Sequence, residues 1–127
     1  MTSSNDQFAF LKDFIKLIDF AISVGFKVTF GETMRTPEQQ KIYFDTGRSK
    51  TMNSRHLVKM AGDLNFFKDN IYINSLPAKQ AIIILAPVGH FWESLSPLNR
   101  WGGNFDRDWS KTDNWHDVPH FERLDSK

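Results

Sequence analysis

Two short segments of the 127-residue chain bring histidines and acidic residues together in the sequence. The first segment runs from Ser54 to Asp63 and contains His56. The second segment reads Trp115-His116-Asp117-Val118-Pro119-His120-Phe121-Glu122. Three of the four histidines of the chain therefore stand near carboxylates in polar, loop-like sequence, an arrangement that suits metal binding and acid–base chemistry.

These residue types fit a catalytic zinc ion. Such an ion takes three protein ligands and keeps its fourth position for water, and imidazole and carboxylate groups are suitable ligands. Zinc lowers the pKa of its water and polarises a carbonyl oxygen. A nearby carboxylate can then pass the water proton to the leaving amine, and a cation can stabilise the oxyanion. The chain contains all of these groups.

The composition limits the other candidate chemistries. The chain has no cysteine, so any metal must be held by nitrogen and oxygen ligands, and a cysteine nucleophile is excluded. Its 16 basic and 15 acidic residues nearly balance, which argues against a nucleic-acid partner that depends on a broad basic field. We expect no signal peptide at residues 1–6 and no insertion into a membrane, because no apolar run is long enough to cross a bilayer.

The spacing of the two segments resembles that of a known enzyme family. The pattern is Ser-x-His, an aspartate seven residues after that histidine, and Asp-x-x-His-Phe-Glu near the C-terminus. It is similar to the LAS zinc peptidases, which group lysostaphin-type peptidases, D-Ala-D-Ala peptidases and hedgehog domains. Residues 34–40 look like the family's Arg-Thr-x-x-Gln-Gln segment, and Trp101-Gly102-Gly103 with Trp109 looks like its Trp-Gly-Gly-x-Trp stretch. Within the family, the chain most resembles phage endolysins of the L-alanyl-D-glutamate peptidase type, in the D-Ala-D-Ala carboxypeptidase branch.

The resemblance implies a metal site and a catalytic base. The three zinc ligands that it implies are His56, Asp63 and His120. It also implies that Asp117, three residues before the last ligand, is the general base. His116 is a rival, because its spacing to His120 would suit two ligands on one helical face. Pro119 disfavours a regular helix there, so we favour Asp117.

The resemblance implies further roles around this site. Arg35 would stabilise the oxyanion or hold the substrate. Ser54 would touch the substrate or support the ligands. Trp115 could line the substrate cleft, although an aromatic core is an equally good interpretation of the tryptophans. We interpret Glu122, two residues after the last ligand, as a supporting or structural residue.

One residue departs from the family pattern. The family has glycine three residues after the first histidine, where this chain has Lys59. If the turn there needs a positive φ, Lys59 would be strained.

Periodic patterns predict the elements that must position these residues. Apolar residues at helical spacing predict a helix over about residues 6–24, stopped by Gly25. Alternation predicts a strand over 26–30. Thr36 and Pro37 mark the start of a second helix that ends near Gly47, with Gln39 completing a capping box.

The second half of the chain predicts two more strands and one more helix. Residues 61–67 read as a strand, followed by a turn at Asp69-Asn70 and a return strand over 71–73. A helix over about 76–94 contains Pro87 and should kink or split near Ala86. We expect residues 96–115 to form functional loops and 120–124 to form a last strand. The whole predicts a single α+β domain, 1–127, with helices packed on a small antiparallel sheet. The resemblance implies the same kind of fold, similar to hedgehog and D-Ala-D-Ala peptidase domains.

These observations lead to one main hypothesis and two alternatives. The main hypothesis is a monomeric zinc endolysin that cuts the L-alanyl-D-glutamate bond of the peptidoglycan stem peptide. It would be made in the host cytoplasm, reach the wall through a separate permeabilising factor, and carry no wall-binding domain. The alternatives are a D,D-carboxypeptidase that acts on D-Ala-D-Ala ends and a non-catalytic zinc-binding module.

Overall fold

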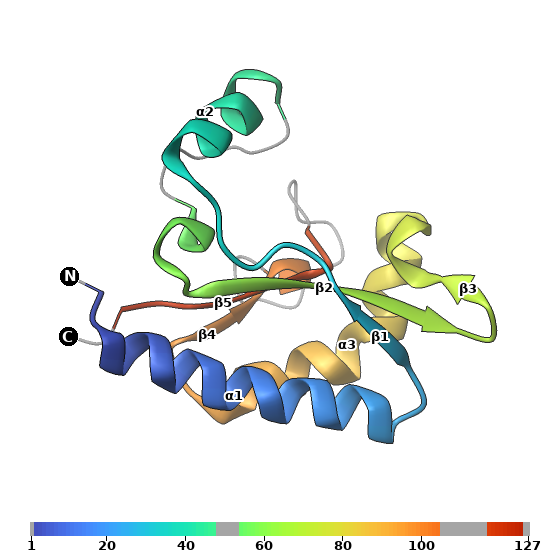
Figure 1. Cartoon of the computed structure of the whole chain (residues 1–127). Coiled ribbons are helices and arrows are strands. Elements are labelled where there is room, and N and C mark those ends of the chain that lie inside the picture. The colour runs from blue at the N-terminus through green and yellow to red at the C-terminus, as the bar shows by residue number, and fades with distance from the viewer. Residues whose placement is uncertain (1, 48–53, 105–116, 126–127) are drawn as a thin grey trace.

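The computed structural model of the chain describes residues 2–47, 54–104 and 117–125 (Figure 1). Within these ranges there are three α-helices, which are α1 (Ser4–Ser23), α2 (Pro37–Asp45) and α3 (Ala78–Leu95). The five strands are β1 (Lys27–Phe30), β2 (Ala61–Lys68), β3 (Ile71–Tyr72), β4 (Asn99–Trp101) and β5 (His120–Arg123). Short 3-10 turns connect them at η1 (Arg55–Val58), η2 (Ile73–Ser75) and η3 (Gly102–Asn104).

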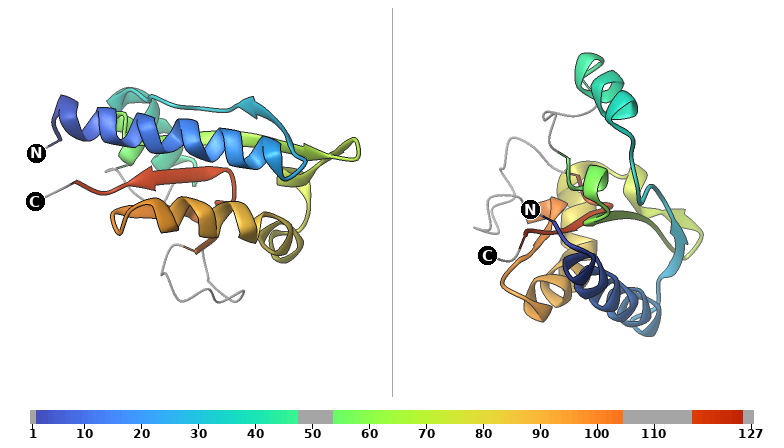
Figure 2. Two further views of the ribbon diagram at one scale, coloured as in Figure 1. Left: turned by 90° about the horizontal axis from the view of Figure 1, so that it is seen from below. Right: turned by 60° about the vertical axis from the view of Figure 1, so that its left-hand side comes forward.

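All strand pairs are antiparallel. The strand order is β1-β2-β5-β4, and β3 pairs with the far end of β2. Helices α1 and α3 lie side by side against one face of the sheet, whereas α2 stands beyond the opposite face (Figures 1 and 2). This confirms the predicted α+β class with a small antiparallel sheet. No helix in the described ranges is long and apolar enough to cross a membrane.

Helix α1 begins at a capping box. The Ser3 hydroxyl accepts a hydrogen bond from the Asp6 backbone N–H, and the Asp6 carboxylate accepts one from the Ser3 backbone N–H, each at 3.1 Å. The buried apolar residues of the helix recur at helical spacing and are Phe10, Phe14, Leu17 and Ala21. Gly25, with a φ of 103°, then turns the chain into β1, as the sequence predicted.

Two glycines let the helices pack very close to the strands. A Cβ at Gly62 of β2 would overlap the Phe14 ring of α1, and a Cβ at Gly89 of α3 would overlap the Trp101 ring of β4. The core between this sheet face and the helices is strongly aromatic. Its fully buried rings are Phe66, Trp92, Trp101 and Phe121. This packing fixes the sheet, so that its other face can carry polar side chains in set positions.

The structure decides two predictions about the second half of the chain. Of the two outcomes expected at Pro87, a kink or a split, the split does not occur, because helix α3 continues from Ala78 to Leu95. Buried residues on both sides of the proline, Leu85 and Trp92 among them, belong to the same core, which outweighs one lost backbone hydrogen bond. Residues 99–101, expected within loops, form β4, because Asn99 and Trp101 are buried in the pair with β5.

The β2–β3 turn has a type that the sequence left open. Both Asp69 and Asn70 have positive φ values, of 52° and 64°. Positive φ at both central positions is typical of a type I′ turn, whose twist matches that of the flanking strands.

Lys59 adopts the left-handed conformation at the end of η1. Its φ is 61° and its ψ is 33°, because the turn closes with a 3.0 Å hydrogen bond from the Met60 N–H to the Arg55 carbonyl. The turn therefore does need a positive φ, and Lys59 carries the strain expected from the sequence. A non-glycine residue in this region costs about 1–2 kcal/mol.

Replacing Lys59 with glycine should therefore stabilise the protein. We expect Lys59→Gly to raise the free energy of unfolding by about 0.5–1 kcal/mol, because the relief of strain exceeds the added entropy of the unfolded chain. Denaturant unfolding measures the change. Lys59→Ala is the matched control, since it removes the same charge and keeps the Cβ. An equal gain in both variants would show that strain is not the cause.

Candidate metal centre

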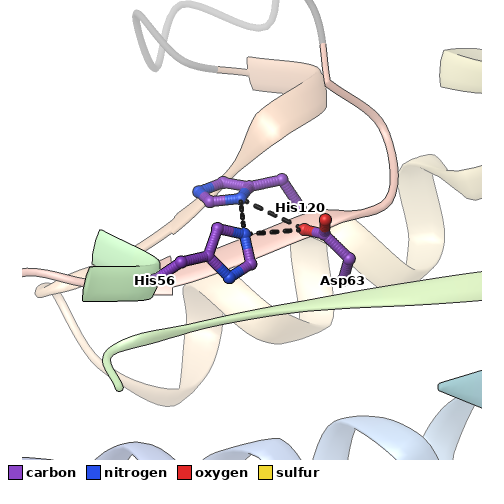
Figure 3. Close-up of side chains that lie close together, drawn as sticks. All are labelled: His56, Asp63 and His120. Carbon is purple, nitrogen blue, oxygen red and sulfur yellow. Dashed lines mark hydrogen bonds and ion pairs between the residues drawn. The ribbon is translucent and has the colours of Figure 1, made fainter. Parts of the chain in front are cut away.

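Three side chains converge on the face of the sheet that α1 and α3 leave free (Figure 3). His56 comes from η1, Asp63 from β2 and His120 from β5. The His56 Nε2 atom lies 3.1 Å from Asp63 Oδ1, and His120 Nδ1 lies 3.2 Å from His56 Nε2 and 3.3 Å from Asp63 Oδ1. The structure thus brings together the three residues that the sequence proposed as metal ligands, in a nearly equilateral triangle of donor atoms.

Strand pairing and a capped turn position these residues. Asp63 and His120 are direct partners in the β2–β5 pair, so their side chains meet on one face. Ser54 is the N-cap of η1, and its hydroxyl accepts a hydrogen bond from the His56 backbone N–H at 3.2 Å. The Arg35 backbone N–H donates to the His56 carbonyl at 3.1 Å. The turn that carries His56 is therefore held at both its start and its side.

Hydrogen bonds from outside the triangle orient both imidazole rings. His56 Nδ1 donates to the Thr33 carbonyl at 3.2 Å, and His120 Nε2 donates to the Glu122 carboxylate at 2.7 Å. Because carbonyl and carboxylate oxygens only accept, these outer nitrogens carry protons. The inner nitrogens, His56 Nε2 and His120 Nδ1, face Asp63 and can hold either a shared proton or a metal ion.

The triangle fits a tetrahedral zinc ion. Ligands about 2.0–2.1 Å from zinc in a tetrahedron lie about 3.3 Å from one another, and the three donor atoms are 3.1–3.3 Å apart. His56 and His120 are buried, whereas the Asp63 side chain is 20% exposed. The residues present could therefore hold a metal ion and leave one side of it accessible.

In the absence of a metal, charge is balanced within the triangle. Burial raises the pKa of Asp63, but the hydrogen bond from His120, together with the contact to the His56 ring, outweighs this effect and holds that pKa well below its usual range. Burial also lowers the pKa of His120, but its hydrogen bonds to Asp63 and Glu122 raise it to about 10. A protonated His120 therefore neutralises the carboxylate at neutral pH.

Arg35 contacts the turn that carries His56 through its backbone, and its side chain is almost fully engaged. Its Nε and Nη2 both donate to Oε1 of Glu32, and its Nη1 donates to Gln40 Oε1 at 2.5 Å and to Ser54 Oγ at 3.3 Å. Its guanidinium lies over the Tyr43 ring at 4.6 Å, and only 9% of its side chain is exposed. Arg35 is thus a fixed positive charge.

Asp117 stands at the entrance to β5. Its backbone N–H donates to the Gly102 carbonyl at 2.9 Å, and its carbonyl accepts from the His120 N–H at 3.0 Å. A Cβ at Gly102 would collide with the Asp117 carbonyl oxygen, so only glycine allows this approach. Asp117 and Asp63 line a cavity of about 440 Å³ that extends toward Tyr72 of β3.

The surroundings of the Asp117 carboxyl group shift its pKa. Burial raises the pKa of Asp117 above its usual range. His120 opposes this shift and the carboxylate of Asp63 adds to it. A raised pKa in a cavity is typical of a group that exchanges protons with a ligand.

A family model described as D-alanyl-D-alanine carboxypeptidase matches residues 47–123. The match covers more than half of the chain and includes the triangle and Asp117. The chain belongs to this family. Peptidases of the family are metallopeptidases, in agreement with a His-Asp-His group that could bind a metal ion.

Two individual proteins are similar to this member of the carboxypeptidase family. A 48-residue stretch is 48% identical to the L-alanyl-D-glutamate peptidase of Listeria phage A118, and covers 38% of this chain and 17% of that protein. The crystal structure of the L-Ala D-Glu endopeptidase ChiX of Serratia marcescens matches with a TM-score of 0.56 and 21% sequence identity. That match covers 89% of this chain and 79% of the other, and shows a shared fold.

The remaining tryptophan and histidine candidates either lie outside the described residues or belong to the core. Trp115, His116 and Trp109 lie outside the described residues. Trp101 is fully buried, and its indole N–H donates to the Val118 carbonyl at 2.9 Å, so it belongs to the core.

The residues that sequence reasoning missed are those that hold the site residues in place. They are Glu32 and Gln40, which bind Arg35, and Thr33, which orients His56. Only Gln40 had a sequence signal, as the last residue of the Arg-Thr-x-x-Gln-Gln segment.

Metal binding should release a proton. Because His120 keeps its proton up to a pKa of about 10, zinc must displace it at neutral pH, whereas Asp63 is already ionised. The apparent zinc affinity should rise about tenfold per pH unit from about pH 7 to 9 and level off above 10. Calorimetry in two buffers of different ionisation enthalpy should find close to one proton released. An affinity independent of pH would contradict this coupling.

Proposed function

We propose that this chain is a zinc-dependent peptidase that cuts the L-alanyl-D-glutamate bond of peptidoglycan stem peptides. The observation that carries the proposal is the triangle of His56, Asp63 and His120 donor atoms at the edge of a polar cavity. The choice of bond is supported by two similar proteins, one phage and one bacterial, that are named for it.

We assign His56 Nε2, Asp63 Oδ1 and His120 Nδ1 as the zinc ligands. When bound there, zinc would act as a Lewis acid that polarises the scissile carbonyl and makes a water molecule more acidic. The protein's own contribution is to keep the three donors in place before the metal arrives. The outer hydrogen bonds to Thr33 and Glu122 supply that order.

We assign Asp117 as the general base. Its carboxylate lines the same cavity as Asp63, which supports a role in receiving the proton of the attacking water and delivering it to the leaving amine. The burial that raises its pKa makes it a stronger base than an exposed aspartate. The backbone contacts to Gly102 and His120 fix its position relative to the ligands.

We assign Arg35 as the cation that stabilises negative charge developing on the substrate. Its contacts with Glu32, Gln40 and Ser54 keep it fixed, so little reorganisation is needed during the reaction. Ser54 serves the site by capping η1 and binding Arg35, which favours the supporting role over direct contact with substrate.

A second candidate is cleavage of D-Ala-D-Ala ends, favoured by the description of the family model. The two activities give different products. Cutting between L-alanine and D-glutamate leaves a new amino group on D-glutamate, whereas D,D-carboxypeptidase activity releases free D-alanine.

Digestion of purified peptidoglycan tests the proposed bond. We expect the zinc-loaded protein to generate D-glutamate amino groups, identified by labelling of new amino ends and mass spectrometry. Chelation of the metal should stop the reaction, and added zinc should restore it. Release of D-alanine without new D-glutamate ends would instead establish the carboxypeptidase activity.

The role of Asp117 is tested by Asp117→Asn, which preserves the shape of the side chain and removes the base. We expect kcat/KM for wall digestion to fall by about 10²–10⁴-fold, with the zinc content unchanged. Asp45→Asn is the matched control, because Asp45 is an exposed aspartate that pairs with Lys41 on α2. Activity of Asp117→Asn close to that of the control would exclude Asp117 as the base.

A further inference from the structure

A row of charged side chains extends from the metal centre across three strands, β2, β5 and β4, on the same sheet face. In β5, Glu122 follows His120 by two residues, so both side chains point to this face. Arg100 of β4 is the direct cross-strand partner of Glu122, as Asp63 of β2 is of His120. A row of charged groups therefore leads from the centre of the sheet to its edge at β4.

The contacts along this row are short and continuous. His120 Nε2 donates to Glu122 Oε1 at 2.7 Å. The other carboxylate oxygen, Oε2, accepts from Arg100 Nη2 at 2.7 Å and from Nε at 3.0 Å. The side chains of His120 and Glu122 are 6% and 5% exposed, and that of Arg100 is 33% exposed. The two oxygens of Glu122 are thus divided between one partner on each side.

We propose that Glu122 and Arg100 are positioning residues that set the metal affinity of His120. This inference rests on the proposed function, in which His120 is a zinc ligand. Glu122 binds the outer nitrogen and so keeps the inner nitrogen, Nδ1, directed at the triangle. Arg100 acts one step further out, by fixing the plane of the Glu122 carboxylate.

Physical chemistry gives each contact a separate effect. A carboxylate that accepts the outer N–H of an imidazole fixes the tautomer and makes the inner nitrogen a better donor to a metal. A buried carboxylate without a second partner would be costly, and the paired hydrogen bonds from Arg100 satisfy its other oxygen in a fixed geometry. Loss of Arg100 should leave the Glu122–His120 bond in place but less ordered.

The same strand offers a matched control. Arg123 follows Glu122 in β5 but points to the opposite face, where its Nη1 lies 3.4 Å from Asp13 of α1. Its side chain is 14% exposed. Arg123→Gln therefore removes a partly buried arginine from β5 without touching the row that leads to His120.

Zinc affinity of the purified full chain, measured by competition with a chromophoric chelator, tests the proposal. We expect Glu122→Gln to weaken zinc binding by about 10–100-fold. We expect Arg100→Gln to weaken it by about two- to fivefold, as for a partly exposed ion pair. Arg123→Gln should bind zinc as the wild type does, even if it lowers the melting temperature.

A spectroscopic measurement separates positioning from general stability. The proton on His120 Nε2 of the zinc-loaded protein should resonate far downfield, because it is hydrogen-bonded to the Glu122 carboxylate. This resonance should move upfield in Glu122→Gln and stay in place in Arg123→Gln. Arg100→Gln, whose side chain is partly exposed, keeps the test valid if Glu122→Gln does not fold.

The outcomes distinguish this inference from the proposed function. If the wild type binds zinc and His56→Ala does not, the metal site stands. If Glu122→Gln and Arg100→Gln then bind zinc as tightly as Arg123→Gln, the positioning role is wrong. If the wild type and His56→Ala bind zinc equally, the proposed metal site fails, and this inference fails with it.

Discussion

The site depends on the register of one strand pair, because β2 and β5 place Asp63 directly opposite His120 in a largely buried setting. A carboxylate and two imidazoles cannot be removed from water without a compensating positive charge. In the metal-free protein a proton on His120 supplies it, and a metal ion would supply it in the same place. The fold therefore holds three donor atoms about as far apart as the corners of a zinc tetrahedron.

The rest of the fold keeps this register fixed. Glycines at positions 62 and 89 let the rings of Phe14 and Trp101 come into direct contact with backbone, which locks α1 against β2 and α3 against β4. Gly102, just after β4, likewise lets the backbone carbonyl of Asp117 come into direct contact with the chain. The helix-covered face supplies rigidity through apolar packing, and the free face carries the chemistry.

The sequence predicted those features that depend on local patterns. The capped start of α2, the strands around Asp63 and His120, and the strain at Lys59 are all set by neighbouring residues. Most of the features that it missed depend on long-range pairing. The Arg100–Glu122 pair exists only because β4 joins β5. The Glu32–Arg35 pair spans only three residues, but it lies in an irregular segment after β1 that no periodic pattern predicts. The continuity of α3 through Pro87 is likewise decided by the core. Trp115, proposed for the cleft, lies outside the described residues and stays a prediction.

The central claim is that one metal ion is held jointly by His56, Asp63 and His120. Anomalous diffraction at the zinc absorption edge, from crystals of the full chain grown with zinc, tests it most directly. A single strong peak is expected about 2.0–2.2 Å from His56 Nε2, Asp63 Oδ1 and His120 Nδ1. A zinc peak elsewhere, or one in which His116 replaces any of the three, would contradict this ligand assignment.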